Sequence, residues 1–235
     1  GGLGHIGSAL IRALPEYRIT ILDNLVSQRY ASLLQLPAPV RFIEGDILDP
    51  RALREAIQGQ DTVVHLAALT DAEASVQNPG PYYQSNEAGA VRVAQICAER
   101  GIAFLFPSST SIYGPQATEV DEDCIPEQAK AHSPYADAKR LAEEEIRDIG
   151  ALDYCIFRLG TIFGPSIGMR FHTVVNRFCW LAAQGKPLTV WRGAWDEQRP
   201  YCALPDAVRA IRWVLQSRRF SGETFNVVTG NHTVR

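Results

Sequence analysis

The stretch Gly1-Gly2-Leu3-Gly4-His5-Ile6-Gly7 decides the fold, because its glycines lead directly into an apolar helical segment at residues 8–14. Missing side chains let the backbone approach a diphosphate, and the first turn of a helix offers unpaired N–H groups to it. Taken alone, the pattern also fits a glycine-rich turn packed against a strand. The candidate phosphate-binding residues are Gly1, Gly4, His5, Ile6 and Gly7.

Strand and helix signals alternate along the rest of the chain. Short β-branched or apolar runs predict strands at residues 18–22, 40–44, 62–67, 102–106, 154–159 and 224–228. Apolar residues at helical spacing predict helices at 8–14, 50–57, 82–100, 134–149, 173–183 and 206–215. This alternation predicts an α/β protein with a doubly wound, Rossmann-type parallel sheet and a small C-terminal substrate-binding region.

Two regions are expected within this order. Residues 1–160 should form the dinucleotide-binding domain, and residues 161–235 should form most of a substrate-binding region, with some elements returning to the first domain. A glycine loop of this kind normally follows a central strand. We therefore expect a strand before Gly1. The chain also stops soon after the predicted strand at 224–228, and so we expect more chain after Arg235.

Composition narrows the possible partners. The 235 residues are 46% hydrophobic and 21% charged, as in globular proteins, and 23 basic against 26 acidic residues give a net charge of −3. This balance does not favour a nucleic acid or an anionic membrane as partner. The five cysteines contain no C-x-x-C pair, so no metal site is expected. No apolar run reaches the roughly 20 residues of a membrane span, and a cytoplasmic location is expected.

Asp23 carries the second nucleotide signal. It closes the predicted strand at 18–22 and stands 22 positions after Gly1. At that position an acidic side chain can accept hydrogen bonds from both hydroxyls of an adenine-side ribose, and it would repel a 2′-phosphate. The sequence therefore favours NAD over NADP.

Acid–base chemistry is suggested by Tyr135 and Lys139. Their i, i+4 spacing puts them on one helix face, about 5–6 Å apart at Cβ. A nearby ammonium should lower the phenol pKa from its usual value of about 10. The same spacing also fits a surface pair without function. Ser108, Ser109 and Thr110 follow the predicted strand at 102–106, at the sheet edge where ligands bind, although a polar turn is the alternative.

Together these motifs resemble the extended short-chain dehydrogenase/reductase family and, within it, the nucleotide-sugar 4-epimerases. The resemblance covers nearly the whole chain. It is carried by residues 1–8, Asp23-Asn24, residues 45–47, 65–68, Asn86 with Gly89, residues 108–114, Ser133-Pro134-Tyr135 with Lys139, residues 157–160, and Gly164-Pro165.

The resemblance implies a role for each candidate residue. Asp46 and Ile47 would border the adenine, Ala67 and Ala68 the diphosphate and ribose, and Lys139 the nicotinamide ribose. The implied NAD-binding set is Gly1, Gly4, His5, Ile6, Gly7, Asp23, Asn24, Asp46, Ile47, Leu66, Ala67, Ala68, Asn86, Ser108, Tyr135 and Lys139. The implied substrate-binding set is Thr110, Thr161 and Arg199, with a surface salt bridge as the alternative for Arg199.

Two candidate residues differ from the family pattern, and two further polar residues lie in predicted strands. Thr161 stands where many relatives carry Asn, and His5 replaces a usual aromatic residue, so the particular sugar stays open. His65 and Arg158 lie in predicted strands, and we interpret them as structural because each must satisfy its polar atoms inside the sheet.

The resemblance implies NAD-dependent inversion of a sugar hydroxyl, most naturally at C4, through a keto-sugar. Tyr135 would exchange the proton, and Ser109 would bond the reacting hydroxyl. A decarboxylase, a dehydratase, a reductase or a non-catalytic NAD-binding sensor are the alternatives; a 4,6-dehydratase is disfavoured because Thr110-Ser111 replaces its typical Asp-Glu pair. The implied partners are a nucleotide-diphosphate sugar and a second copy, paired through the helices at 82–100 and 134–149.

Overall fold

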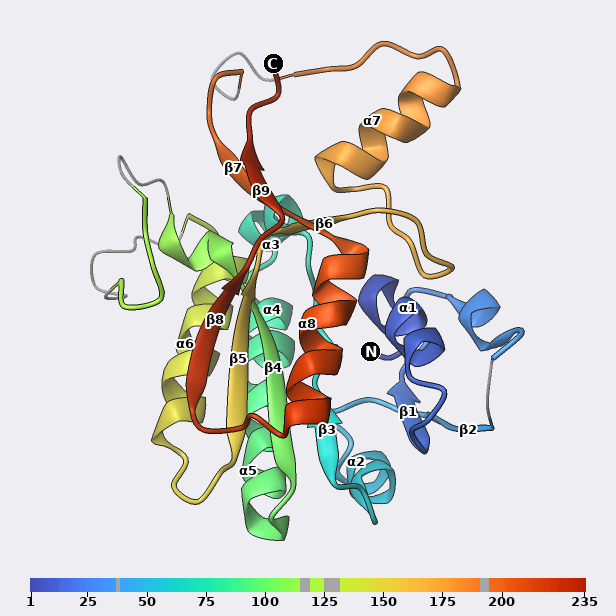
Figure 1. Ribbon diagram of the computed structural model, residues 1–235, viewed down its shortest axis with the longest axis vertical. Coiled ribbons are helices and arrows are strands. Elements are labelled where there is room, and N and C mark those ends of the chain that lie inside the picture. The colour runs from blue at the N-terminus through green and yellow to red at the C-terminus, as the bar shows by residue number, and fades with distance from the viewer. Residues whose placement is uncertain (37–38, 115–118, 125–131, 191–194) are drawn as a thin grey trace.

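The structure is a computed structural model that describes residues 1–36, 39–114, 119–124, 132–190 and 195–235 (Figure 1). Its described strands form three sheets. The largest is parallel, in the order β3 (Thr62–Val64), β4 (Ala103–Ser109), β5 (Tyr154–Leu159) and β8 (Glu223–Val227). The second pairs β1 (Ile19–Asp23) with β2 (Val40–Glu44) in parallel. The third has the order β6 (Thr161–Phe163), β7 (Arg199–Ala203) and β9 (Gly230–His232), with β9 antiparallel to β7.

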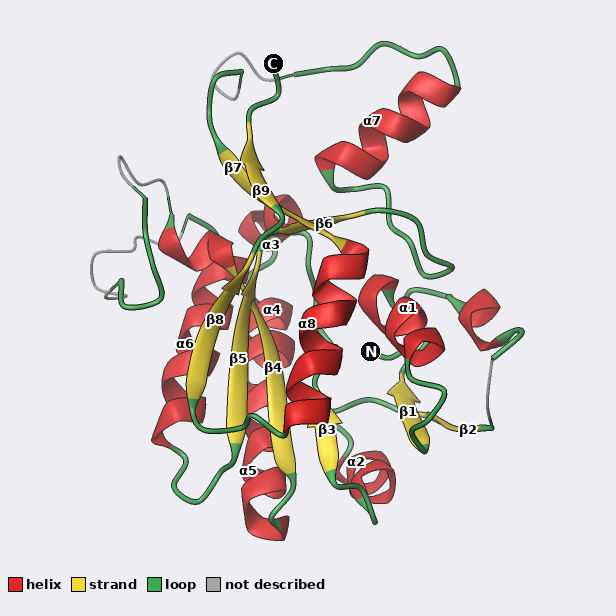
Figure 2. Ribbon diagram, viewed as in Figure 1, coloured by secondary structure: helices red, strands yellow, loops and turns green. Residues whose placement is uncertain are grey.

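Helices connect and cover these strands (Figure 2). The α-helices are α1 (His5–Ala13), α2 (Pro50–Ile57), α3 (Ala72–Gln77), α4 (Gly80–Tyr82), α5 (Ala90–Arg100), α6 (Pro134–Asp148), α7 (Val174–Ala183) and α8 (Leu204–Ser217). Two 3₁₀ turns, η1 (Tyr30–Leu33) and η3 (Thr110–Tyr113), and one π-helix, η2 (Tyr83–Gly89), complete the described helical elements.

Local sequence explains where the helices start. Asp49 and Ser133 cap α2 and α6 by accepting the amides of Arg51 and Ala136, and a proline follows each cap at the first helical position. Such caps satisfy amides that have no partner within the helix, and proline there costs no hydrogen bond.

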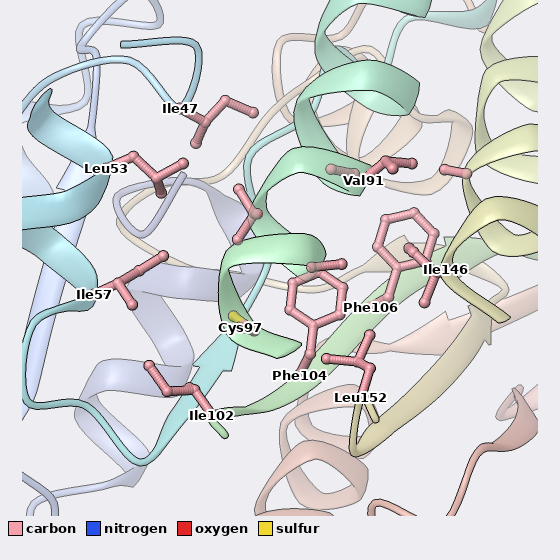
Figure 3. Packing of buried hydrophobic residues seen from close by; sticks show 14 of the residues in the cluster. Ile47, Leu53, Ile57, Val91, Cys97, Ile102, Phe104, Phe106, Ile146 and Leu152 are labelled. Carbon is pink, nitrogen blue, oxygen red and sulfur yellow. The ribbon is translucent and has the colours of Figure 1, made fainter. Parts of the chain in front are cut away.

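The core lies on both faces of the large sheet. On one face Phe104 and Phe106 of β4 pack with Cys97 of α5 and Ile146 of α6 (Figure 3). On the other face Leu105 and its neighbours pack against residues of α1 and α8. Parallel sheets are covered in this way because their strands are apolar on both faces. The predicted α/β, Rossmann-type fold is confirmed.

Some predicted boundaries were wrong. The strand expected at 62–67 ends at Val64, and β4 continues to Ser109 instead of ending at residue 106. Ser108 and Ser109 are therefore strand residues paired with Arg158 and Leu159, rather than part of a turn. Polar side chains at a strand end look like a turn in the sequence, although the ladder with β5 continues through them.

The sequence analysis also missed β6, β7, β9 and α3. Strands of three residues, such as β6 and β9, are too short to show a period-two pattern, and they depend on pairing with β7, which is distant in the sequence. In Figure 1 this small sheet and α7 lie beyond the carboxyl ends of β4 and β5. None of the described helices is long and apolar enough to cross a membrane.

Candidate active site

The glycine loop has no room for side chains at two of its predicted positions. A Cβ on Gly1 would lie 2.3 Å from the amide nitrogen of Ala67, and one on Gly7 would lie 2.2 Å from the carbonyl oxygen of Gly2. Gly4 is the N-cap of α1; no side chain caps it, and the first turn of this helix holds no acidic residue. The first-turn amides, including those of His5 and Ile6, therefore form a site suited to an anion.

Asp23, the last residue of β1, is almost fully buried beside this loop. Its carboxylate oxygens accept the amides of Leu3 and Leu25, each at 3.0 Å. A carboxylate has about four acceptor positions, so two amides leave room for further hydroxyl donors. The neighbouring Asn24 donates to Asp46 at 2.8 Å, which joins the ends of β1 and β2.

Two predicted cofactor residues, Asn86 and Ile47, pack against or bond to neighbouring protein groups. Asn86, in the π-helix η2, uses its amide oxygen and nitrogen to bond both backbone groups of Leu69, at 2.8 and 2.7 Å. It thereby fixes the segment after β3, which includes Leu66, Ala67 and Ala68 and lies against Gly1. Ile47 is buried against Gly89, whose missing side chain leaves space for it.

The structure brings Ser109 and Tyr135 into contact. Ser109 ends β4, and Tyr135 lies in the first turn of α6, where its amide donates to Ser75 Oγ of α3 at 3.2 Å. Ser109 lies close enough to Tyr135 to lower the pKa of its phenol, and Ser109 Oγ lies 2.7 Å from Ser111 Oγ. Two hydroxyls and a phenol thus meet at the carboxyl end of the large sheet.

Lys139 is buried one turn along α6 from Tyr135. Its Nζ donates to the carbonyl oxygen of Pro107 at 2.8 Å and lies 4.4 Å from the centroid of the Phe106 ring. Burial lowers the pKa of Lys139 to about 8, and the negative charge of Glu143 opposes part of that decrease. Lys139 can therefore change its charge close to physiological pH.

The expectation for the pKa of Tyr135 was wrong. Withdrawal from solvent raises the pKa of this phenol, and the hydrogen bond with Ser109 offsets part of the increase. The ammonium of Lys139 is turned to Pro107 instead of the phenol, and so spacing along a helix did not predict electrostatic coupling. In this state the phenol is protonated at neutral pH.

Arg158 has the contacts expected of a structural residue, whereas His65 lies just after β3 and its buried Nε2 has no hydrogen-bond partner among the described residues. Arg158 is buried in β5 and donates to both oxygens of Glu143 in α6, and also to the hydroxyl of Tyr113. The ring of His65 lies against Phe104 and Phe106, and burial lowers its pKa to about 3. The imidazole is therefore neutral at physiological pH.

The substrate candidates are less closely gathered. Thr110 Oγ1 donates to the carbonyl oxygen of Leu159 at 3.2 Å, and Thr161 pairs with Tyr201 in the small sheet. Arg199, at the start of β7, forms an exposed ion pair of 2.8 Å with Glu197. This pair is the surface salt bridge that the sequence left open as the alternative.

The sequence analysis missed the segment that follows β6. Gly168 is buried against the glycine loop, and a Cβ there would lie 2.4 Å from the carbonyl oxygen of Gly4. Its amide donates to Ser8 Oγ at 3.0 Å, and Arg170 donates to Thr70 Oγ1 at 2.6 Å. Gly168 lies in a stretch of mixed polar and apolar residues, and a glycine there is too weak a signal to predict this contact across 160 residues.

The chain is similar to known proteins in sequence and in fold. The chain is 35% identical over 159 residues to UDP-glucose 4-epimerase of Haemophilus influenzae, an alignment that covers 63% of this chain and 46% of that protein. It is 27% identical to UDP-N-acetyl-alpha-D-glucosaminuronate decarboxylase of Bacillus cytotoxicus, covering 97% of this chain and 73% of the relative. The solved structure of UDP-N-acetylglucosamine 4-epimerase from Methanobrevibacter ruminantium M1 matches with a TM-score of 0.86 and 26% identity, covering 100% of this chain and 76% of that one.

The matches differ in how much of each protein they cover. The chain spans about half the length of the UDP-glucose 4-epimerases that it matches. A family model, that of the NAD dependent epimerase/dehydratase family, matches residues 1–228. This match confirms the family-level resemblance inferred from the sequence motifs, and the chain belongs to the NAD dependent epimerase/dehydratase family.

Proposed function

We propose that this chain is an NAD-dependent nucleotide-sugar epimerase that inverts a sugar hydroxyl, at C4, through a keto-sugar. The observation that carries the proposal is the proximity of Tyr135 and Ser109 at the carboxyl end of β4, with Lys139 buried one turn away. Ligands bind at this edge of open α/β sheets, and a phenol held by a hydroxyl can exchange a proton with a sugar hydroxyl there.

The residues around the glycine loop fit NAD. The amides of α1 and the close backbone approach at Gly1 and Gly7 suit the diphosphate, and Asp23 retains acceptor positions for the ribose. When bound, NAD would supply the reversible oxidation that side chains cannot perform. We assign Asn24, Asp46 and Ile47 to the adenine side, and Leu66, Ala67, Ala68 and Ser108 to the remainder of the pocket.

Tyr135, Ser109 and Lys139 have separate roles in this proposal. Tyr135 holds and moves the proton at its Oη, and Ser109 orients both that phenol and the reacting hydroxyl. We assign the buried Lys139, whose Nζ is bonded to the carbonyl oxygen of Pro107, to the nicotinamide ribose. Asn86 acts through Leu69 and is a positioning residue, since its amide is already bonded there.

The substrate assignment rests on relatives and on the small sheet. The archaeal structure described above was solved with UDP-N-acetylmuramic acid, which supports a nucleotide-diphosphate sugar as the substrate class. We assign Thr110, Thr161 and Arg199 to its binding, which requires Arg199 to exchange Glu197 for a diphosphate. A decarboxylase is the second candidate, because the relative with that activity aligns along 97% of this chain.

The proposal also covers the domain organisation, the oligomeric state and the cellular location of the protein. We assign residues 1–160 to the dinucleotide-binding domain and 161–235 mostly to the substrate region, with α8 and β8 packing on the first domain. We further propose a two-fold dimer through α5 and α6 and a cytoplasmic location. Light scattering of the protein at micromolar concentration tests the dimer, and a monomer would remove it.

One screen tests the proposed reaction. The purified protein with NAD is incubated with UDP-, dTDP-, GDP- and CDP-sugars, and products are identified by NMR. We expect a C4 epimer from one nucleotide series, whereas loss of a carboxylate as CO₂ would support the decarboxylase. Calorimetry should show NAD binding at least about tenfold tighter than NADP because of Asp23. Equal affinities would show that Asp23 does not face the ribose.

A further inference from the structure

The segment between β6 and α7 lies against the glycine loop. Gly168 contacts the carbonyl oxygens of Gly4 and Leu3 so closely that a Cβ would approach them to 2.4 and 2.5 Å, and its amide is held by Ser8 Oγ. Asn176 of α7 donates to the carbonyl oxygen of Arg170 and accepts the amide of Gly164, which fixes both ends of the segment. We call residues 164–172 the strap. Figure 1 shows it descending from the small sheet to α1.

The strap brings basic side chains to the start of α1. Arg170 and His172 from the strap, Arg29 from the loop after β1, and His5 from the first turn of α1 lie within electrostatic reach of one another. Arg29 Nη1 and His5 Nε2 are buried and have no hydrogen-bond partner among the described residues. Burial and the three neighbours lower the pKa of His5 to about 4.

The acidic residues that the structure describes next to this cluster are already engaged in other hydrogen bonds. Asp23 faces Arg29, but both its oxygens already accept amides. Asp71 faces His172, and it caps α3 by accepting the amide of Ala74. The guanidinium groups of Arg29 and Arg170 repel each other, an anion between them would relieve this repulsion, and the positive end of α1 adds to the same potential.

We propose that Arg170 and Arg29, supported by His172 and His5, bind the diphosphate of the dinucleotide from the side opposite the α1 amides, so that the strap holds the cofactor in place. This inference rests on the proposed function for the identity of the anion. It gives the C-terminal region a part in cofactor binding, in addition to its part in substrate binding. Because the strap continues into α7, cofactor retention depends on the packing of that region.

Calorimetry with NAD and ADP-ribose tests the strap. The two ligands share the diphosphate and differ in the nicotinamide. If Arg170 forms a charge-assisted hydrogen bond to the diphosphate, Arg170→Gln should weaken the affinities for NAD and for ADP-ribose by the same factor, about 10- to 100-fold. Arg29→Gln, on a separate segment, should give a similar loss. Equal losses would assign both guanidinium groups to the diphosphate.

Matched controls separate charge from structure. Arg177→Gln removes the same charge from an exposed position on α7 and should change neither affinity by more than about twofold. Thr70→Val removes the hydrogen-bond partner of Arg170 while keeping its charge, and should cost less than about threefold. Thermal unfolding of each variant shows that the fold is retained.

Several outcomes would overturn the inference. If Arg170→Gln and Arg29→Gln both bind ADP-ribose with wild-type affinity, these residues do not bind the diphosphate. The epimerase proposal would be unaffected by that result. A loss confined to NAD would place Arg170 at the nicotinamide instead. A wild-type protein that binds neither ligand would contradict both the inference and the proposed cofactor. A protein that shows the expected losses without converting any sugar would contradict the proposed reaction alone.

Discussion

Strand β4 and helix α7 have similarly apolar sequences but different surroundings. In β4 the residues from Ala103 to Ser108 are buried, whereas in α7 the buried residue is Asn176, and Trp180 is 50% exposed. The difference shows that hydrophobicity alone does not place a segment in the core. β4 is buried because strands flank it on both edges and helices cover both faces, while α7 lies beyond the sheet and connects to it through the strap.

The largest expected effect on stability concerns an ion pair in the well-packed region. Glu143→Gln leaves the guanidinium of Arg158, which is 2% exposed, without its charged partner. Removing one member of a buried pair costs about 3–5 kcal/mol, and urea denaturation should show such a decrease in the free energy of unfolding. The matched change in the C-terminal region, Glu197→Gln, breaks the exposed pair with Arg199 and should cost less than about 1 kcal/mol. Similar decreases in the free energy of unfolding for Glu143→Gln and Glu197→Gln would contradict the difference between the two regions.

Cysteine labelling compares the regions by accessibility. Cys179 on α7 is exposed, whereas Cys97 and Cys155 are buried and burial raises the pKa of each thiol to about 12. Iodoacetamide should therefore modify Cys179 at least about 100-fold faster than either buried thiol, as followed by mass spectrometry of the intact and digested protein. Rapid modification of Cys97 would show that the core around β4 opens more readily than its packing implies.

Burial of His65 should make the free energy of unfolding depend on pH. Its pKa is near 6.5 when unfolded and about 3 in the folded protein, so between these values the unfolded state binds more protons. Stability should therefore fall with decreasing pH, by about 1.4 kcal/mol per pH unit below pH 6. His65→Leu should remove this contribution to the pH dependence of the free energy of unfolding. An unchanged slope in His65→Leu would show that His65 is not the responsible group.

Sequence patterns predicted the existence of every strand in the two parallel sheets, and the bounds of several elements, because these signals are local. β2 and β5 have the predicted bounds, and α6 differs by one residue, since Ser133-Pro134 caps it and an apolar stripe runs along it. The small sheet could not be predicted in this way. Its short strands depend on pairing between segments that lie about 30 to 40 residues apart, which no local periodicity records.

The candidate site divides in the same manner. Glycine spacing, Asp23 and the Tyr135–Lys139 pair are motifs of one segment each, and the structure places them at the predicted sheet edge. The direction of Lys139 toward Pro107, and the contact of the strap with the glycine loop, depend on three-dimensional packing. They set the pKa values and the charge around the site, and so the electrostatics of the site had to come from the structure.

NMR detection of C4 inversion in wild type and Tyr135→Phe tests the central claim most directly. The substitution removes the phenol hydroxyl next to Ser109 while retaining the ring, so folding and ADP-ribose affinity should be unchanged. Positioned acid–base catalysis contributes about 10²- to 10⁴-fold, and turnover should fall by at least the lower factor. Tyr135→Phe that retained more than about a tenth of wild-type turnover would contradict the account, because the proton would then pass through another group.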